Sequence, residues 1–195
     1  MKSLKFALAP IAFLVAPTPA FAQLGTGPDS QQFIEAVEKQ DGDKATQLVR
    51  SKPRIVDSRN SKGDTALIIA LSRSDRNWTG FLLNEGADPN LPGKGGDTPL
   101  IAATRAGFDE AADWLLGMGA KVDGANKMGE TALIIAVQQR EIPMVKLLLN
   151  AGANPDKSDT AAGLSARDYA TRDTRSRQIL QLIEAKKPRP ASASR

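Results

Sequence analysis

Histidine and cysteine are both absent from this chain of 195 residues. Histidine is the side chain that most often acts as a general base near neutral pH, and histidine and cysteine are common ligands of zinc. Without cysteine the chain forms no disulfide bonds, on which small secreted domains usually depend. We therefore expect no metal, no cofactor and no catalytic residue, and a fold that is stable without covalent cross-links.

Two catalytic arrangements need neither histidine nor cysteine: a serine–lysine pair and a pair of carboxylates. The candidate serines, Ser72, Ser74 and Ser165, lie where a helix cap or an exposed helix face accounts for them. Asp109 and Glu110 stand at a predicted helix N-terminus, where the helix dipole favours acidic residues. The recurring glycines follow a regular turn spacing, so none of them forms a phosphate-binding loop. We predict that the protein is not an enzyme.

A unit of 33 residues occurs three times in succession. Two sets of glycines mark the period: Gly63, Gly96 and Gly129 at the start of each copy, and Gly86, Gly119 and Gly152 near its end. Between them, apolar residues recur at helical spacing in two halves, the second of which carries a leucine cluster. The later glycine suits the left-handed conformation in which many helices end. A fixed period of this size predicts a solenoid of stacked helix pairs rather than one globular core.

These copies resemble the ankyrin repeat. They share G-x-T-[AP]-L at the first helix, a leucine cluster in the second, and, in two copies, G-A-[DN]-P-[ND] after it; the match is strong over residues 63–156 and weaker over about 29–184. The resemblance implies an all-α fold, a solenoid of stacked helix-turn-helix units with hairpin loops and about five helix pairs, including two caps. The histidine usual after T-P-L is replaced by Ile68, Ile101 and Ile134, so we expect more apolar packing to hold the loops.

The first 22 residues have the pattern of a signal peptide. Lys2 and Lys5 form a basic start, a short apolar run follows, and residues 20–22 (Ala-Phe-Ala) fit a small-residue cleavage site. The apolar run is shorter than the roughly 20 residues needed to span a bilayer. We predict cleavage after Ala22 and a periplasmic or secreted mature protein. The absence of disulfides favours a bacterial periplasm, and an uncleaved membrane tether is the alternative.

The predicted organisation follows from these patterns. A signal peptide covers 1–22, a short linker 23–28, the ankyrin repeat domain 29–185, and a disordered basic tail 186–195. Within the domain, the N-terminal capping repeat covers 29–62, the central repeats cover 63–95, 96–128 and 129–162, and the C-terminal capping repeat covers 163–185.

Positive charge is concentrated at the two ends of the chain. Of 26 basic residues against 22 acidic ones, six lie in the signal peptide and the tail: Lys2, Lys5, Lys186, Lys187, Arg189 and Arg195. Removing them leaves 20 basic and 22 acidic residues, a charge of −2 for the fold. Binding of nucleic acid would need a basic stripe on the fold. We therefore predict no nucleic-acid partner, no stable membrane anchor after cleavage, and a protein that is monomeric alone.

The family resemblance implies a protein partner, bound by the hairpin tips and the inner helices on the concave side. The residues predicted to bind it are Arg59, Lys62, Asp64, Arg73, Lys94, Asp97, Arg105, Lys127, Met128, Glu130, Gln138 and Gln139. Six of these are basic and three acidic, a balance of +3 that predicts an acidic partner surface. Because exposed charges contribute little to stability, we expect reversal of Arg73 and Arg105 to leave stability nearly unchanged. A small-molecule or cell-wall binder using the same groove is the alternative, although the groove lacks aromatic residues that would stack on sugars.

Overall fold

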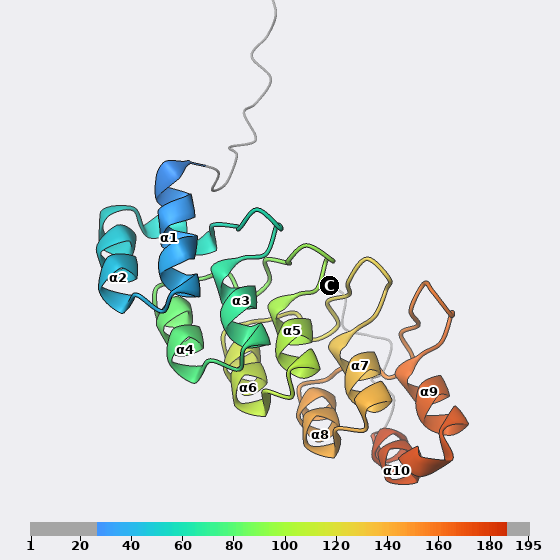
Figure 1. Ribbon diagram of the computed structural model, residues 1–195. Helices are drawn as coiled ribbons and strands as arrows, with labels where there is room; N and C mark the ends of the chain where they lie inside the picture. The colour runs from blue at the N-terminus through green and yellow to red at the C-terminus, as the bar shows by residue number, and fades with distance from the viewer. Residues whose placement is uncertain (1–26, 187–195) are drawn as a thin grey trace, which may run out of the picture.

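Helices stack in pairs along the chain in the computed structural model, which describes residues 27–186 (Figure 1). Over this range there are ten α-helices, two short 3-10 helices (Pro53–Asp57 and Thr174–Ser176) and no strand longer than an isolated bridge. The five pairs are α1 (Pro28–Glu38) with α2 (Gly42–Ser51), α3 (Ala66–Ser72) with α4 (Arg76–Asn84), α5 (Pro99–Arg105) with α6 (Asp109–Gly117), α7 (Ala132–Gln139) with α8 (Ile142–Asn150), and α9 (Ala166–Arg172) with α10 (Arg177–Ala185). The predicted all-α solenoid is confirmed. The predicted signal peptide, most of the linker and nearly all of the tail lie outside the described residues.

The odd-numbered helices form an inner row and the even-numbered helices an outer row (Figure 1). Neighbouring helices of the inner row pack against one another, as α3 does on α5 and α5 on α7. Hairpin loops connect each outer helix to the next inner helix and project beyond the inner row. Each repeat therefore contributes one loop and one inner helix to a common surface.

Caps fix where the inner helices begin. In the three central repeats a threonine hydroxyl (Thr65, Thr98 or Thr131) accepts the backbone N–H three residues further on, at 3.2–3.3 Å. In the last repeat Ser165 and Asp168 form a reciprocal capping box around α9. The outer helices α4, α6 and α8 are each followed by a glycine with positive φ, Gly86, Gly119 or Gly152 in turn (+86°, +88°, +88°). These glycines allow the chain to turn into the next loop.

The core runs without interruption through all five pairs. The inner helices are only seven to eleven residues long, and helices of that length are marginal on their own, so packing between repeats must stabilise them. Every residue from Ala66 to Leu71 in α3 and from Ala132 to Val137 in α7 is buried, because neighbouring helices cover both sides. The isoleucines that replace the usual histidine are buried as well, in agreement with the expected apolar packing.

Candidate binding face

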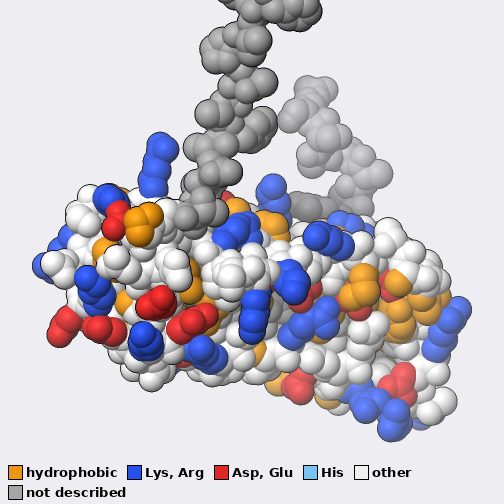
Figure 2. Space-filling model, turned by 45° about the horizontal axis from the view of Figure 1, so that its top comes forward, with side chains coloured by type: hydrophobic (Ala, Val, Ile, Leu, Met, Phe, Trp, Pro, Cys, Tyr) orange, Lys and Arg blue, Asp and Glu red, His pale blue; other side chains and the backbone are white. Residues whose placement is uncertain are grey.

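The hairpin loops and the inner helices together form one surface, which we call the groove face. It consists of the loops at residues 58–64, 91–97, 124–130 and 157–164 and the exposed positions of the inner row. Lysine and arginine side chains lie along the middle of this face (Figure 2). All twelve residues predicted to bind a partner lie on its loops or at the C-terminal ends of α3, α5 and α7.

The predicted residues differ in how accessible they are. Lys62, Lys94, Lys127 and Met128 are exposed on the loops, and half of the Met128 surface (50 %) is open to solvent. The helix-end residues Arg73, Arg105, Gln138 and Gln139 are exposed too. The three acidic residues, Asp64, Asp97 and Glu130, are half-buried at the bases of the loops.

Arg59 is used within the fold. Its Nη1 atom donates to the carbonyl oxygens of Gly63 at 2.7 Å and of Pro92 at 2.6 Å, so that it ties its own loop to the next one. A weaker link follows one repeat later, where the Lys127 ammonium donates to the Lys94 carbonyl at 3.3 Å. The guanidinium of Arg59 is therefore mainly a structural connection between loops, although the side chain also lines a second pocket beside α1.

Asparagine side chains hold the loops from inside, a role that sequence reasoning missed. Asn60 Oδ1 accepts the backbone N–H groups of Lys62 and Asp64, both at 3.0 Å, and Asn126 Oδ1 accepts those of Met128 and Glu130 at 2.9 and 3.0 Å. The 33-residue period could have revealed the position, because these two asparagines stand three residues before the repeat glycine. Each asparagine therefore fixes the turn of its own loop through two backbone hydrogen bonds.

Arg105 is the centre of a polar network between two repeats. Its Nε donates to Asp97 Oδ2 at 2.9 Å and its Nη2 donates to Glu130 Oε2 at 2.8 Å. The buried amide of Asn126 donates to the same two carboxylates, at 2.8 Å each. Partial burial opposes the charged form of Arg105, but the hydrogen bonds and charges of Asp97 and Glu130 outweigh it and raise the pKa of the guanidinium.

This network changes a prediction made from the sequence. Reversing Arg73 and Arg105 together was expected to leave stability nearly unchanged, on the reasoning that exposed charges contribute little. Instead, 41 % of its side chain is exposed and its partner Glu130 is only 15 % exposed, so glutamate at position 105 would place a third carboxylate between two others. Arg73 does fit the expectation, since the hydrogen bond of its side chain is an exposed contact of 3.3 Å to the carbonyl of Glu38.

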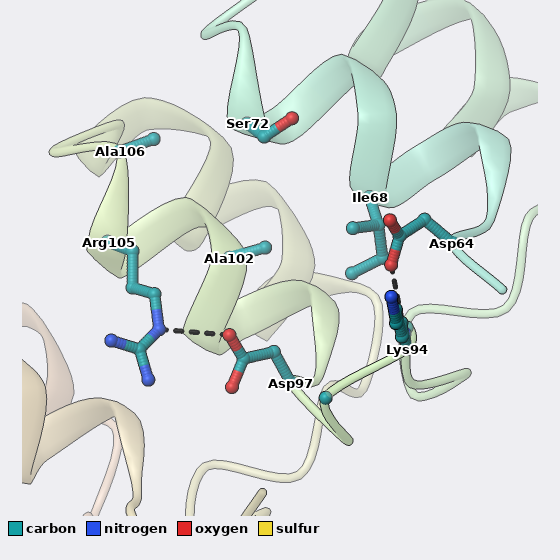
Figure 3. Close-up of a pocket in the computed structure, with 10 residues that line it drawn as sticks. Asp64, Ile68, Ser72, Lys94, Asp97, Ala102, Arg105 and Ala106 are labelled. Atoms are coloured by element: carbon teal, nitrogen blue, oxygen red, sulfur yellow. Dashed lines mark hydrogen bonds and ion pairs between the residues drawn. The ribbon is translucent and has the colours of Figure 1, made fainter. Parts of the chain in front are cut away.

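A pocket of about 240 Å³ opens between α3 and α5 (Figure 3). It brings together four of the predicted residues, Asp64, Lys94, Asp97 and Arg105. Ile68, Ser72, Ala102 and Ala106 from the two inner helices and Gly93 and Gly95 from the loop complete the lining. We call it the α3–α5 pocket.

The chain belongs to the ankyrin-repeat family. The family's sequence model, described as "Ankyrin repeats (3 copies)", matches residues 33–124 and 80–159, which together span more than half of the chain. Ankyrin repeats generally mediate protein–protein interactions, and the family is typically non-enzymatic. A comparison with curated proteins gave no match.

Two observations concern the part of the chain that the structure describes. No helix there combines the length and the apolar character needed to cross a membrane. Within residues 27–186 no three side chains of the metal-binding types come together in a way that could hold an ion.

Proposed function

We propose that this protein is a non-enzymatic interaction module that binds one protein partner on the groove face. The observation that carries the proposal is the α3–α5 pocket, which lies open on that face and is lined by residues of two adjacent repeats. The exposed lysines of the loops and the exposed Met128 surround it with both polar and apolar contact sites.

The charge available to a partner comes mainly from the loop lysines. Among the described residues, no carboxylate lies within ion-pair distance of Lys62, Lys94 or Lys127, whereas Arg105 is paired with two. Because these lysines form no ion pair with a described residue, their charge can attract an acidic surface and speed its association. We propose a partner with an acidic surface around its contact region.

Binding of a small molecule in the same groove is less well supported. The α3–α5 pocket, at about 240 Å³, is smaller than the roughly 300–1,000 Å³ of typical ligand sites. The pocket beside α1 is larger, about 390 Å³, but Ile34 is the one hydrophobic side chain in its lining, which contains no aromatic side chain. Ligand pockets are mostly apolar and aromatic, which favours a protein partner.

We further propose that the protein acts after export, as a monomeric accessory subunit or adaptor for a periplasmic protein. The support is the signal-like pattern of residues 1–22 and the absence of cysteine. Intact mass of the protein recovered from a bacterial periplasm tests this, because the proposal predicts a chain that begins at Gln23. Recovery of the full-length chain in the membrane fraction would contradict it.

Matched charge reversals test the binding face. The variant Lys94→Glu/Lys127→Glu changes two loop lysines, and Lys146→Glu/Arg177→Glu changes two exposed residues of the outer helices α8 and α10. Each immobilised protein captures partners from a periplasmic extract, quantified by mass spectrometry. We expect the loop variant to reduce the recovered partner about tenfold or more, which corresponds to roughly 1.4 kcal/mol, and the outer variant to change it little. Loss of capture with the outer variant alone would refute the proposed face.

A further inference from the structure

The α3–α5 pocket occupies a place that is filled one repeat later. Asp64, Asp97 and Glu130 stand at the same repeat position, each directly after a repeat glycine. Between Asp97 and Glu130, the Arg105 guanidinium bridges the two carboxylates at 2.9 and 2.8 Å, and the Asn126 amide joins them as well. In this repeat, therefore, an arginine and an asparagine side chain fill the space between two equivalent carboxylates, Asp97 and Glu130.

The space between Asp64 and Asp97, one repeat earlier, has no equivalent of these two bridging side chains. Thirty-three residues before Arg105 the chain has Ser72, and thirty-three before Asn126 it has Gly93; both line the pocket. At Gly93 a side chain would collide with the fold, because a Cβ there would lie 2.8 Å from Asp64 Oδ1. The small residues leave the space open while Asp64 and Asp97, the two carboxylates, remain.

Asp64 keeps an unused acceptor. Its Oδ1 accepts the backbone N–H of Lys94 at 2.9 Å, and its Oδ2 has no hydrogen-bond partner within residues 27–186. In Figure 3, Asp97 lies between the Arg105 side chain and the contact of Asp64 with Lys94. Arg105 turns toward the following repeat, where it reaches Glu130, so it does not supply a bridge on the Asp64 side.

The charge and the walls of the pocket suit one kind of side chain. The lining holds two carboxylates, Asp64 and Asp97, and two cations, Lys94 and Arg105. Arg105 is already paired with Asp97 and with Glu130 outside the pocket, so among the described residues Asp64 has no ion-pair partner and can take one more cation. Ile68 and Ala102 form an apolar wall that can pack against methylene groups. A guanidinium donates in a fixed fork that matches two acceptors, whereas an ammonium acts as a point charge.

We propose that the α3–α5 pocket binds an arginine side chain of the partner, whose guanidinium bridges Asp64 and Asp97 as Arg105 bridges Asp97 and Glu130. This rests on the proposed function, because the arginine belongs to a protein bound on the groove face. The loop lysines around the pocket favour acidic residues beside that arginine. The partner segment therefore carries an arginine among acidic residues.

Supplying the missing arginine from the protein itself tests the geometry. The variant Ser72→Arg places a guanidinium at the position equivalent to Arg105. We expect its thermal midpoint to rise by roughly 2–4 °C over that of Ser72→Gln, which adds an uncharged side chain of similar reach. The gain should disappear in the background of Asp64→Asn, which keeps the oxygen that accepts from Lys94. A gain that is the same with Asp64→Asn, or no gain at all, would overturn the proposed bridge.

Binding of a free arginine probe tests the site in the unchanged pocket. The mature chain, labelled with ¹⁵N, is titrated with Nα-acetyl-arginine amide and with the uncharged citrulline equivalent, and amide shifts are followed by NMR. We expect saturable shifts at Gly93–Gly95 and Ala106 with the arginine probe only. In Asp64→Asn the affinity for this probe should be about tenfold lower. The absence of saturable shifts, or equal binding of the citrulline probe, would refute the arginine site.

The two proposals fail in different ways. If capture depends on the loop lysines but the arginine probe does not bind, the groove face is supported and the arginine site is refuted. If capture does not depend on the loop lysines, binding on the groove face is refuted, whether or not the arginine probe binds.

Discussion

Arg105 and Arg73 occupy neighbouring positions on the groove face, yet replacing each by glutamate should have very different effects on stability. Arg105 makes two ion pairs with half-buried carboxylates, and Arg73 makes one exposed hydrogen bond to a backbone carbonyl. The comparison keeps the residue type, the substitution and the face constant. It therefore isolates the contribution of the polar network between repeats.

The magnitude follows from the contacts. Two partly exposed ion pairs contribute about 1–2 kcal/mol together, after allowance for screening by solvent. A new carboxylate close to Asp97 and Glu130 adds repulsion of about 1 kcal/mol. We expect Arg105→Glu to lower the free energy of unfolding by roughly 2–3 kcal/mol and the thermal midpoint by roughly 5–10 °C. Arg73→Glu should stay within about 0.5 kcal/mol of the unchanged protein.

Urea unfolding followed by circular dichroism measures both variants. A cycle that combines Arg105→Ala with Glu130→Gln then tests whether the two side chains are coupled, with an expected coupling of about 0.5 kcal/mol or more. Equal midpoints for Arg105→Glu and Arg73→Glu, together with zero coupling, would show that the network does not join the repeats.

Two further predictions concern the core and the C-terminal cap. Leu148 is fully buried in α8, so Leu148→Ala should lower the free energy of unfolding by about 2–5 kcal/mol. An unchanged denaturation midpoint would mean that the core is assigned wrongly. In the last repeat, hydrogen bonds from Ser165 lower the pKa of Asp168, and those from Arg140 and Arg175 lower the pKa of Asp173. Carboxylates with lowered pKa stabilise the fold above the unfolded value of about 3.9, and this stability is lost as the pH falls below it. Hydrogen exchange across a pH series should therefore show α9 and α10 losing protection before α3 and α4, and the reverse order would contradict this.

The period of 33 residues was sufficient to predict the fold, because each unit must bury its apolar residues against the next and only stacking achieves this. The same register placed the twelve predicted residues on one face. It did not indicate which of their charges are engaged, since the partners of Arg59 and Arg105 come from the adjoining loop one repeat away. Those contacts depend on the relative position of neighbouring repeats, which spacing along one chain does not specify.

The small residues at the α3–α5 pocket illustrate the same limit. Ser72 and Gly93 are unremarkable in sequence, and their importance appears only when the equivalent positions, Arg105 and Asn126, are seen to fill the corresponding space. The space between Asp64 and Asp97 becomes evident only beside the next repeat, because neither motif nor composition marks Ser72 and Gly93.

Photo-crosslinking at two exposed methionines tests the central claim most directly. Met128 lies on a loop of the groove face and Met118 directly follows the outer helix α6, and the two are almost equally exposed, at 50 % and 48 %. Benzoylphenylalanine at either position forms a crosslink to another protein only where that protein lies against it. With the probe at position 128 we predict a defined crosslinked species in the periplasm, which the change Lys94→Glu/Lys127→Glu weakens, and none with the probe at position 118. A species formed from position 118 and not from position 128 would contradict binding on the groove face.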